Sequence, residues 1–343
     1  MVCKIHERSG ARRARALTVG VDRRADGGAP APGGPRPGLR LPGSGRSAPS
    51  PGAEGNSMLR DVAFLADMGG GSAFEVAGGT VTGTDHLVAG RPNQDAYAFR
   101  AEGGSLVAVV CDGCGSGARS EVGAALGARI VAEQVLGALR RGGDLDSPAT
   151  WEEVRRAALA PLRDVAAGMG GSFTEVLSTF FLFTVVGLAI SGDRACAFSL
   201  GDGLIALGDE LLRLGPFPRD EPPYLAYGLL DRPPGGEAPR FTVHRAFPSS
   251  ALRTALLGTD GAIDLLESSS RQIPRGGEVG PLSRFWEDDR YFQNPDAVRR
   301  RLALINRSVT RPVWKEERME REGGLLRDDT TVVVVRRAQG ARD

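Results

Sequence analysis

The stretch that most constrains the fold runs from Leu106 to Gly117 and reads LVAVVCDGCGSG. Its five apolar residues, most of them β-branched, predict a strand that is buried on both faces. Asp112 stands where this strand ends, and the glycines after it, beginning with Gly113, let the backbone approach a ligand closely because no Cβ intervenes. A long amphipathic helix is expected from Ser120. A carboxylate held between a strand and a glycine-rich turn indicates a metal or phosphate site, although Asp-Gly is also an ordinary turn dipeptide.

Residues 1–57 differ in composition from the rest of the chain. They are rich in Arg, Gly, Pro, Ala and Ser. They carry ten Lys and Arg against four Asp and Glu, which is a net charge of +6, whereas the whole chain has a net charge of +1. Such a segment cannot bury enough apolar surface to offset its conformational entropy, so we expect a disordered basic tail. Two alternatives are an arm for an acidic partner and a start codon assigned too early, with Met58 as the true start. Residues 58–343 then form one mildly acidic domain of net charge −5.

The cysteines and the apolar runs indicate the cellular compartment of the protein. Cys111 and Cys114 form a C-x-x-C pair, which is typical of a redox site or of half a zinc site. A zinc site would need two more ligands, and the sequence offers no second pair and only three histidines. We favour the interpretation that Cys111 and Cys114 are small, buried, apolar side chains beside the turn. The longest apolar run, 180–190, is too short to span a bilayer, and the tail lacks the apolar segment of a signal peptide. We therefore expect a reduced, cytoplasmic protein that makes no membrane contact.

Hydrophobic spacing predicts the elements of the domain. Strands are expected at 73–81, 96–99, 106–111, 178–190, 195–200, 241–247 and 254–258, with a hairpin over 204–214 and a last strand after Asp329. Helices are expected over 120–140, over 151–169 with a Thr150–Glu153 capping box and a bend at Pro161, and from Asn294 to about Arg307. Residues 215–240 are rich in Pro and Gly, as expected for a lid or binding flap, and 267–293 form a second irregular segment.

Aspartates recur at the boundaries of the predicted strands, and most stand beside Gly or another polar turn residue. They are Asp95, Asp112, Asp202, Asp260 and Asp328. Carboxylates gathered in one pocket would repel each other and take up protons unless cations compensated them. Oxygen-only ligands select Mg²⁺ or Mn²⁺, and two such ions about 3.5–4 Å apart are typical of phosphoester hydrolysis. Spacing along the chain leaves open whether these aspartates meet in space.

Five motifs in order resemble the type 2C (PPM) metal-dependent protein phosphatases. They read NQD, VVCDG, SLGDG, LGTDG and DDTTVVVV, and the similarity extends from about Gly79 to Arg337. The chain is most similar to a bacterial branch of the family in which the second motif reads DGCGSG and a G-x-x-H element precedes Q-D. This resemblance implies an α+β fold, a β-sandwich of two antiparallel sheets flanked by helices in α/β/β/α layers. The helices expected after 106–111 and near 296–307 are compatible with that fold.

The resemblance also implies a role for each aspartate. Asp112 matches the carboxylate that bridges two metal ions, and the carbonyl of Gly113 matches a neighbouring ligand. The further assignments are Asp260 and Asp328 to the second ion, Asp95 to a metal or its water, and Asp202 to a third, weaker ion of bacterial members. Asp112 and Asp95 are the catalytic candidates, and the cofactors implied are two Mg²⁺ or Mn²⁺ ions with a third as an addition.

The chain departs from the family pattern at several positions. Gln94 stands where many relatives carry a carboxylate ligand. The phosphate-binding arginine of the family would fall at Gly90, and Arg91, one place later, is a candidate substrate-binding residue or an ordinary solvated arginine. Asp329 replaces the usual Asn, which leaves Asp328 and Asp329 both open as the last ligand. The end of the second motif differs as well, so contacts to substrate are expected to differ.

The function implied is hydrolysis of phosphoserine and phosphothreonine on proteins, by direct attack of a metal-bridging water on phosphorus. The sequence shows no Ser-His or Cys-His constellation of the kind that would form a covalent intermediate. The expected partners are a phosphorylated protein and a cognate serine/threonine kinase. A second class is a catalytically weak or silent phosphatase-like module that binds a phosphoprotein or a kinase, although the metal carboxylates whose loss would mark it are present. A nucleic-acid binder would need arginines on an ordered surface, so no nucleic-acid partner is expected.

Overall fold

The structure is a computed structural model that describes residues 73–274 and 276–338. All of them belong to one compact unit, Ser57–Asp343. The tail expected over 1–57 and the proposed start at Met58 lie outside the described residues.

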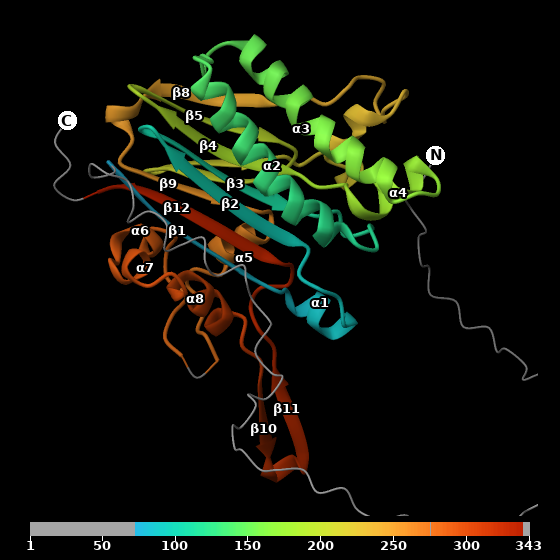
Figure 1. The fold of residues 1–343 in the computed structure, drawn as a ribbon. Helices are drawn as coiled ribbons and strands as arrows, with labels where there is room; N and C mark the ends of the chain where they lie inside the picture. Colours follow the sequence, from blue (N-terminus) through green and yellow to red (C-terminus); the bar gives the residue numbers. More distant parts are fainter. Residues whose placement is uncertain (1–72, 275, 339–343) are drawn as a thin grey trace, which may run out of the picture. The chain divides into compact units, whose positions relative to one another are not determined.

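Two five-stranded antiparallel sheets form the centre of this unit (Figure 1). The first sheet consists, in spatial order, of β1 (Phe74–Val81), β12 (Thr330–Arg337), β9 (Thr254–Gly258), β6 (Gly203–Leu207) and β7 (Glu210–Leu214). The second consists of β2 (Asp95–Glu102), β3 (Ser105–Asp112), β4 (Val185–Ser191), β5 (Arg194–Leu200) and β8 (Thr242–Pro248).

Strand β3 shows why the two sheets pack face to face. Its side chains point alternately to the two faces of the sheet. Leu106 to Val110 at even positions lie in the core between the sheets, whereas Val107 to Cys111 at odd positions lie in the core under the helices. Both faces are buried, as the continuous apolar run predicted. The fold class is therefore confirmed as two antiparallel sheets flanked by helices.

Helices cover the outer face of each sheet (Figure 1). Over the second sheet lie α2 (Ser120–Arg140), α3 (Pro148–Gly168) and α4 (Phe173–Phe180). Over the first lie α5 (Gly261–Glu267), α6 (Arg284–Glu287), α7 (Arg290–Gln293) and α8 (Ala297–Ile305). Helix α2 is long and apolar enough to cross a membrane, but most of its apolar window is buried, as in the core helix of a globular domain.

Three local predictions were wrong. Residues 178–190 are not one strand, because α4 occupies the first part and β4 begins only at Val185. The Thr150–Glu153 capping box does not form, because α3 already begins at Pro148, where the missing N–H of proline costs nothing. The irregular segment 267–293 contains the short helices α6 and α7. Helix α3 continues through Pro161 to Gly168.

Two segments surround the end of the sandwich where β3 finishes. Helix α1 (Thr84–Ala89) precedes β2. The expected flap, 215–240, contains the 3-10 turns η2 (Pro218–Asp220) and η3 (Leu225–Leu229), and its centre is anchored because Leu225 is fully buried against the α3 side of the core.

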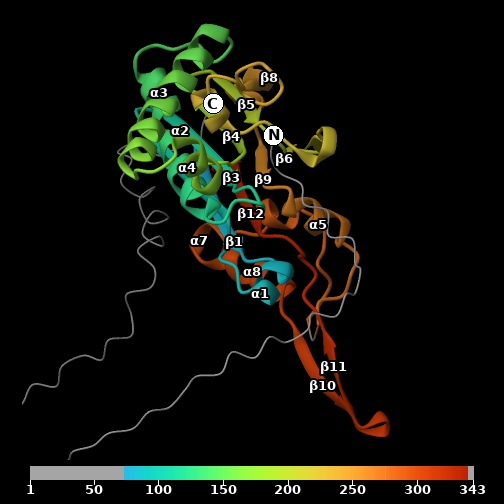
Figure 2. The same ribbon diagram turned by 90° about the vertical axis from the view of Figure 1, so that its right-hand side faces the viewer.

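A two-stranded hairpin, which the sequence analysis did not predict, leaves the domain after α8 (Figure 2). It consists of β10 (Val309–Val313) and β11 (Arg318–Glu322), with the 3-10 turn η5 (Trp314–Glu316) between them. A further 3-10 turn, η4 (Ser249–Ala251), separates β8 from β9. The chain returns from the hairpin directly to the loop that carries Asp328.

Candidate metal centre

Strand register brings the predicted aspartates to one end of the sandwich. Asp95 begins β2 and Asp112 ends β3, and the antiparallel register makes these two residues direct partners. Gly258, the last residue of β9, pairs with residues near the starts of both β6 and β12. The three remaining aspartates stand in the loops at these strand ends: Asp202 before β6, Asp260 after β9 and Asp328 before β12.

The electrostatics of the site show that these carboxylates act on one another. Burial, and next the charge of Asp260, raise the pKa of Asp112 well above its usual range, with further contributions from Asp95, Asp202 and Asp328. Burial and the neighbouring charges of Asp328 and Asp202 raise the pKa of Asp260 to about 7. A cluster of acidic groups with raised pKa values marks a site at which a cation would be favoured.

Two buried oxygens of the first motif accept no hydrogen bond from the residues described. They are Asp95 Oδ1 and Gln94 Oε1. The other carboxylate oxygen of Asp95 accepts a hydrogen bond from Thr259 Oγ1 at 2.7 Å, and burial raises the pKa of Asp95. A buried acceptor is costly unless a donor or a cation meets it, so Asp95 Oδ1 fits a metal ligand.

The turn after Asp112 is built for close approach of the backbone. A Cβ at Gly113 would lie 2.8 Å from the carbonyl oxygens of Gln94 and Ser120, so only glycine fits there. The Gly113 N–H donates to Gln94 O at 3.1 Å. Among the described residues we find no hydrogen bond to the Gly113 carbonyl, which is the backbone ligand expected from the sequence.

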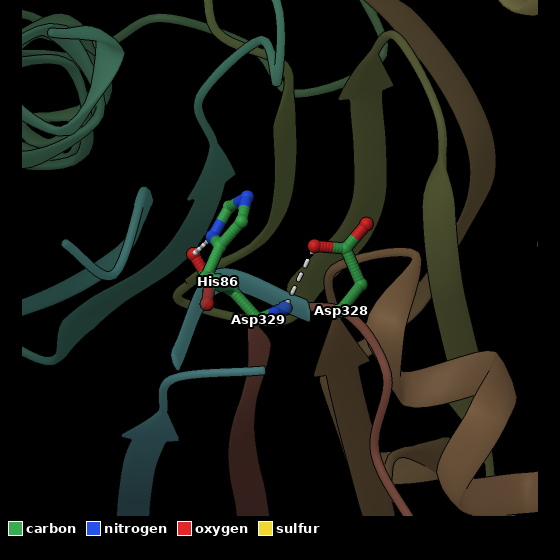
Figure 3. Close-up of side chains that lie close together, drawn as sticks. All are labelled: His86, Asp328 and Asp329. Atoms are coloured by element: carbon green, nitrogen blue, oxygen red, sulfur yellow. Dashed lines mark hydrogen bonds and ion pairs between the residues drawn. The ribbon is translucent and has the colours of Figure 1, made fainter. Parts of the chain in front are cut away.

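Asp328 and Asp329 have different surroundings in the structure (Figure 3). The Asp329 side chain is 2% exposed, and its two oxygens accept hydrogen bonds from Gly83 N–H, Gln94 N–H and the His86 ring. Asp328 Oδ1 accepts the Asp329 N–H at 2.8 Å, but the Asp328 side chain is exposed and lines an open pocket together with Asp260. Asp328 is therefore the better candidate for the last ligand.

This pocket has a volume of about 510 Å³ and lies beside Asp260 and Asp328, two of the five predicted aspartates. It is lined by Asp260, Asp328, His86, Arg91 and Arg327, among others. Arg91 Nη2 donates to the carbonyl oxygen of Gly115 at 2.7 Å, which places the guanidinium between the pocket and the glycine-rich turn. The position of Arg91 is thus suited to a phosphate group, whether or not its place in the motif matches the family.

Several residues near the predicted aspartates were not expected from the sequence. Thr259 was overlooked although it stands next to Asp260. Tyr224, from the expected flap, is buried beside Cys114 and Asp112, and this burial raises the pKa of its hydroxyl well above the usual value. His86 was visible only as part of the G-x-x-H element. Its bond to Asp329 joins residues 243 positions apart, which no local pattern reveals.

The two cysteines of the C-x-x-C pair lie in different surroundings. Cys111 is fully buried under the helices, and burial raises the pKa of its thiol. Cys114 Sγ lies 3.0 Å from Ser116 Oγ. Neither cysteine belongs to a group of potential metal ligands among the residues described.

A family model described as protein phosphatase 2C matches residues 82–288. No curated protein matches the chain. One similar solved structure is PppA, a key regulatory component of T6SS in Pseudomonas aeruginosa, which is 21% identical with a TM-score of 0.42; the match covers 78% of this chain and 99% of that chain.

Two further solved structures are the catalytic domain of the serine threonine protein phosphatase PstP in complex with two manganese ions and RsbX in complex with magnesium. PstP is 16% identical with a TM-score of 0.37, over 77% of this chain and 97% of that chain. RsbX is 12% identical with a TM-score of 0.38, over 77% of this chain and 96% of that chain. At these identities and TM-scores, the metal ions in the PstP and RsbX structures are properties of those two proteins.

Proposed function

Because the chain belongs to the protein phosphatase 2C family, we propose that it is a Mg²⁺- or Mn²⁺-dependent phosphatase that hydrolyses phosphoserine and phosphothreonine on proteins. The observation that supports this most is the set of interacting aspartates at one end of the sandwich, with a buried oxygen of Asp95 that no described residue compensates. A set of oxygen ligands of this kind suits Mg²⁺ and Mn²⁺.

Each residue has a task in this proposal. Two divalent ions, when bound, lower the pKa of a water and offset the charge that develops at phosphorus. Asp112, central to the cluster, would contact both ions, with the Gly113 carbonyl beside it. Asp260 and Asp328 would hold one ion at the pocket, and Asp95, fixed by Thr259, would present its free oxygen to the other. Asp202 would support a third, weaker ion.

Arg91 is proposed to bind the phosphate group of the substrate. Its guanidinium lines the same pocket as Asp260 and Asp328 and can donate two parallel hydrogen bonds to a phosphate. Arg91→Ala is expected to raise KM more than it lowers kcat. The loss in kcat/KM should be about tenfold or more, because a hydrogen bond to a charged group contributes about 1.5–3 kcal/mol. Steady-state kinetics with a phosphopeptide measure it. Arg141→Ala, an exposed arginine paired with Glu153, is the control.

The experiment that tests the function is phosphate release from matched peptides carrying phosphoserine, phosphothreonine or phosphotyrosine, with Mn²⁺ present. We expect turnover of the first two. Binding of these peptides without turnover, in a protein shown to contain the metal, would instead favour the regulatory module. The preserved ligand set is the feature that favours the enzyme. A phosphorylated protein and its kinase as partners, and a cytoplasmic location, belong to the same proposal.

A further inference from the structure

Asp329 connects the two segments that carry Asp95 and Asp328. Its Oδ1 accepts the Gly83 N–H at 2.7 Å, and its Oδ2 accepts the Gln94 N–H at 2.5 Å. Gln94 is the residue directly before Asp95, and Asp329 itself directly follows Asp328. A movement of the Asp329 side chain would therefore change the distance between two of the proposed metal ligands.

The backbone around Asp329 is shaped for this contact. A Cβ at Gly83 would lie 2.3 Å from the carbonyl carbon of Asp328, so only glycine allows the Gly83 N–H to come this close. The Asp329 N–H in turn donates to Asp328 Oδ1 at 2.8 Å, which orients the neighbouring carboxylate. Holding the Asp329 side chain therefore also holds the backbone N–H group that orients the Asp328 carboxylate.

His86 supplies the third donor to the same carboxylate. Its Nδ1 lies 2.8 Å from Asp329 Oδ2, and Figure 3 shows the other ring nitrogen on the side of the ring away from Asp329. His86 belongs to α1, a helix with no buried residue, which the N–H groups of Thr84 and Asp85 also attach to the domain through the carbonyl oxygens of Leu326 and Arg327. A buried carboxylate is stable only when several donors meet it, and these three donors do so.

We propose that Asp329 and His86 form a positioning pair, which fixes Asp95 and Asp328 relative to each other without coordinating the metal. The proposal rests on the proposed function, since it requires that these aspartates bind metal. It also accounts for the carboxylate where the family usually has Asn. One Asn side chain has a single acceptor oxygen, and its NH₂ group would face either the Gly83 or the Gln94 backbone donor.

A direct metal site at His86, Asp328 and Asp329 is the alternative. Potential ligand atoms of these three residues lie within 4.8 Å of one another. Both Asp329 oxygens, however, already accept short hydrogen bonds from backbone N–H groups, and a cation there would face those donors. The favoured assignment is therefore an outer set of groups that orients the ligands, a role whose loss typically weakens metal affinity by about 10–100-fold.

The test is calorimetric titration of Mn²⁺ into the full chain and its variants. Asp329→Asn and His86→Leu are expected to weaken Mn²⁺ binding by about 10–100-fold. His86→Gln keeps a donor near Asp329 and is expected to bind Mn²⁺ more tightly than His86→Leu. His244→Gln removes a histidine bonded to Ser199 on β5, and Arg141→Ala removes an exposed arginine paired with Glu153, so both serve as controls.

The outcomes separate the hypotheses. A parent protein that binds no Mn²⁺ would refute the proposed function. If the parent binds Mn²⁺ and both Asp329→Asn and His86→Leu bind it like the controls, the pair has no positioning role. If Asp329→Asn fails to fold by circular dichroism, the comparison of the two His86 variants decides alone. Direct nitrogen coupling in the pulsed EPR spectrum of the Mn²⁺-loaded parent, lost in His86→Leu, would make His86 a ligand and overturn the proposal.

Discussion

Asp112→Asn is expected to lower kcat by on the order of 10²–10³ at saturating Mn²⁺, the scale for removing one preorganised electrostatic group. The reason is the central place of Asp112 in the cluster, where it interacts with Asp95, Asp202, Asp260 and Asp328. The amide keeps the shape of the side chain, but it removes the negative charge and replaces one of the two ligand oxygens with an NH₂ group, so this position can no longer bridge two cations well. Steady-state kinetics beside a calorimetric Mn²⁺ titration measure the effect.

Asp202→Asn is the matched comparison. We expect this variant to keep two bound Mn²⁺ ions and to lose less activity, because Asp202 is assigned to a weaker, outer ion. Both variants should remain folded, since removing one charge from a metal-free acidic cluster relieves repulsion. If Asp112→Asn binds Mn²⁺ and turns over like the parent, the centre lies elsewhere and the assignment of each residue by motif is wrong.

The strands could be predicted because short runs of apolar, mostly β-branched residues are a strong local signal. β3 illustrates this, since its buried faces were visible as an unbroken apolar run. The run that continued from 178 into β4 misled the prediction, because apolar residues also form the buried side of α4. A capping signal was present there: Ser172 accepts the Glu175 N–H at 3.4 Å, and the S-x-x-E pattern stands in the sequence.

The hairpin β10–β11 could not be predicted from apolar periodicity. Its strands carry charged residues that pair across the ladder, such as Arg311 with Glu320 at 2.8 Å. Trp314 at its tip is 83% exposed. Cross-strand charge pairs stabilise such a ribbon without burying apolar surface, so a scan for hydrophobic spacing has little to detect.

Some features of the candidate site were visible in the sequence, and others depend on the fold. Aspartates at strand ends were recognisable one by one, but their meeting depends on the register of two sheets. The choice between Asp328 and Asp329 depended on burial and on hydrogen bonds to Gly83 and Gln94, which are distant in sequence. His86 could be listed as part of a motif, yet its partner became known only from the fold.

Removal of divalent cations is expected to abolish hydrolysis, and added Mn²⁺ or Mg²⁺ to restore it, since carboxylates bind such ions reversibly. The metal-free site should also hold protons that the metal must displace. Burial and nearby charges raise the pKa of Asp260 to about 7 and raise that of Asp328 as well. Because the protonated acid cannot ligate, Mn²⁺ affinity should fall as the pH drops from about 8 to about 6.

Two measurements check this prediction. Phosphatase activity is recorded in EDTA and after the return of Mn²⁺, Mg²⁺ or Zn²⁺. The heat of Mn²⁺ binding near pH 7 is then compared in two buffers with different ionisation enthalpies, where released protons appear as a difference between the two heats. Asp264→Asn, which changes a pocket carboxylate that bonds the Arg327 N–H, tests whether the protons come from the ligands themselves. Full activity in chelator, or rescue by zinc alone, would contradict a centre of hard oxygen ligands, because such ligand sets suit Mg²⁺ and Mn²⁺, whereas zinc sites are typically built with thiolate and imidazole.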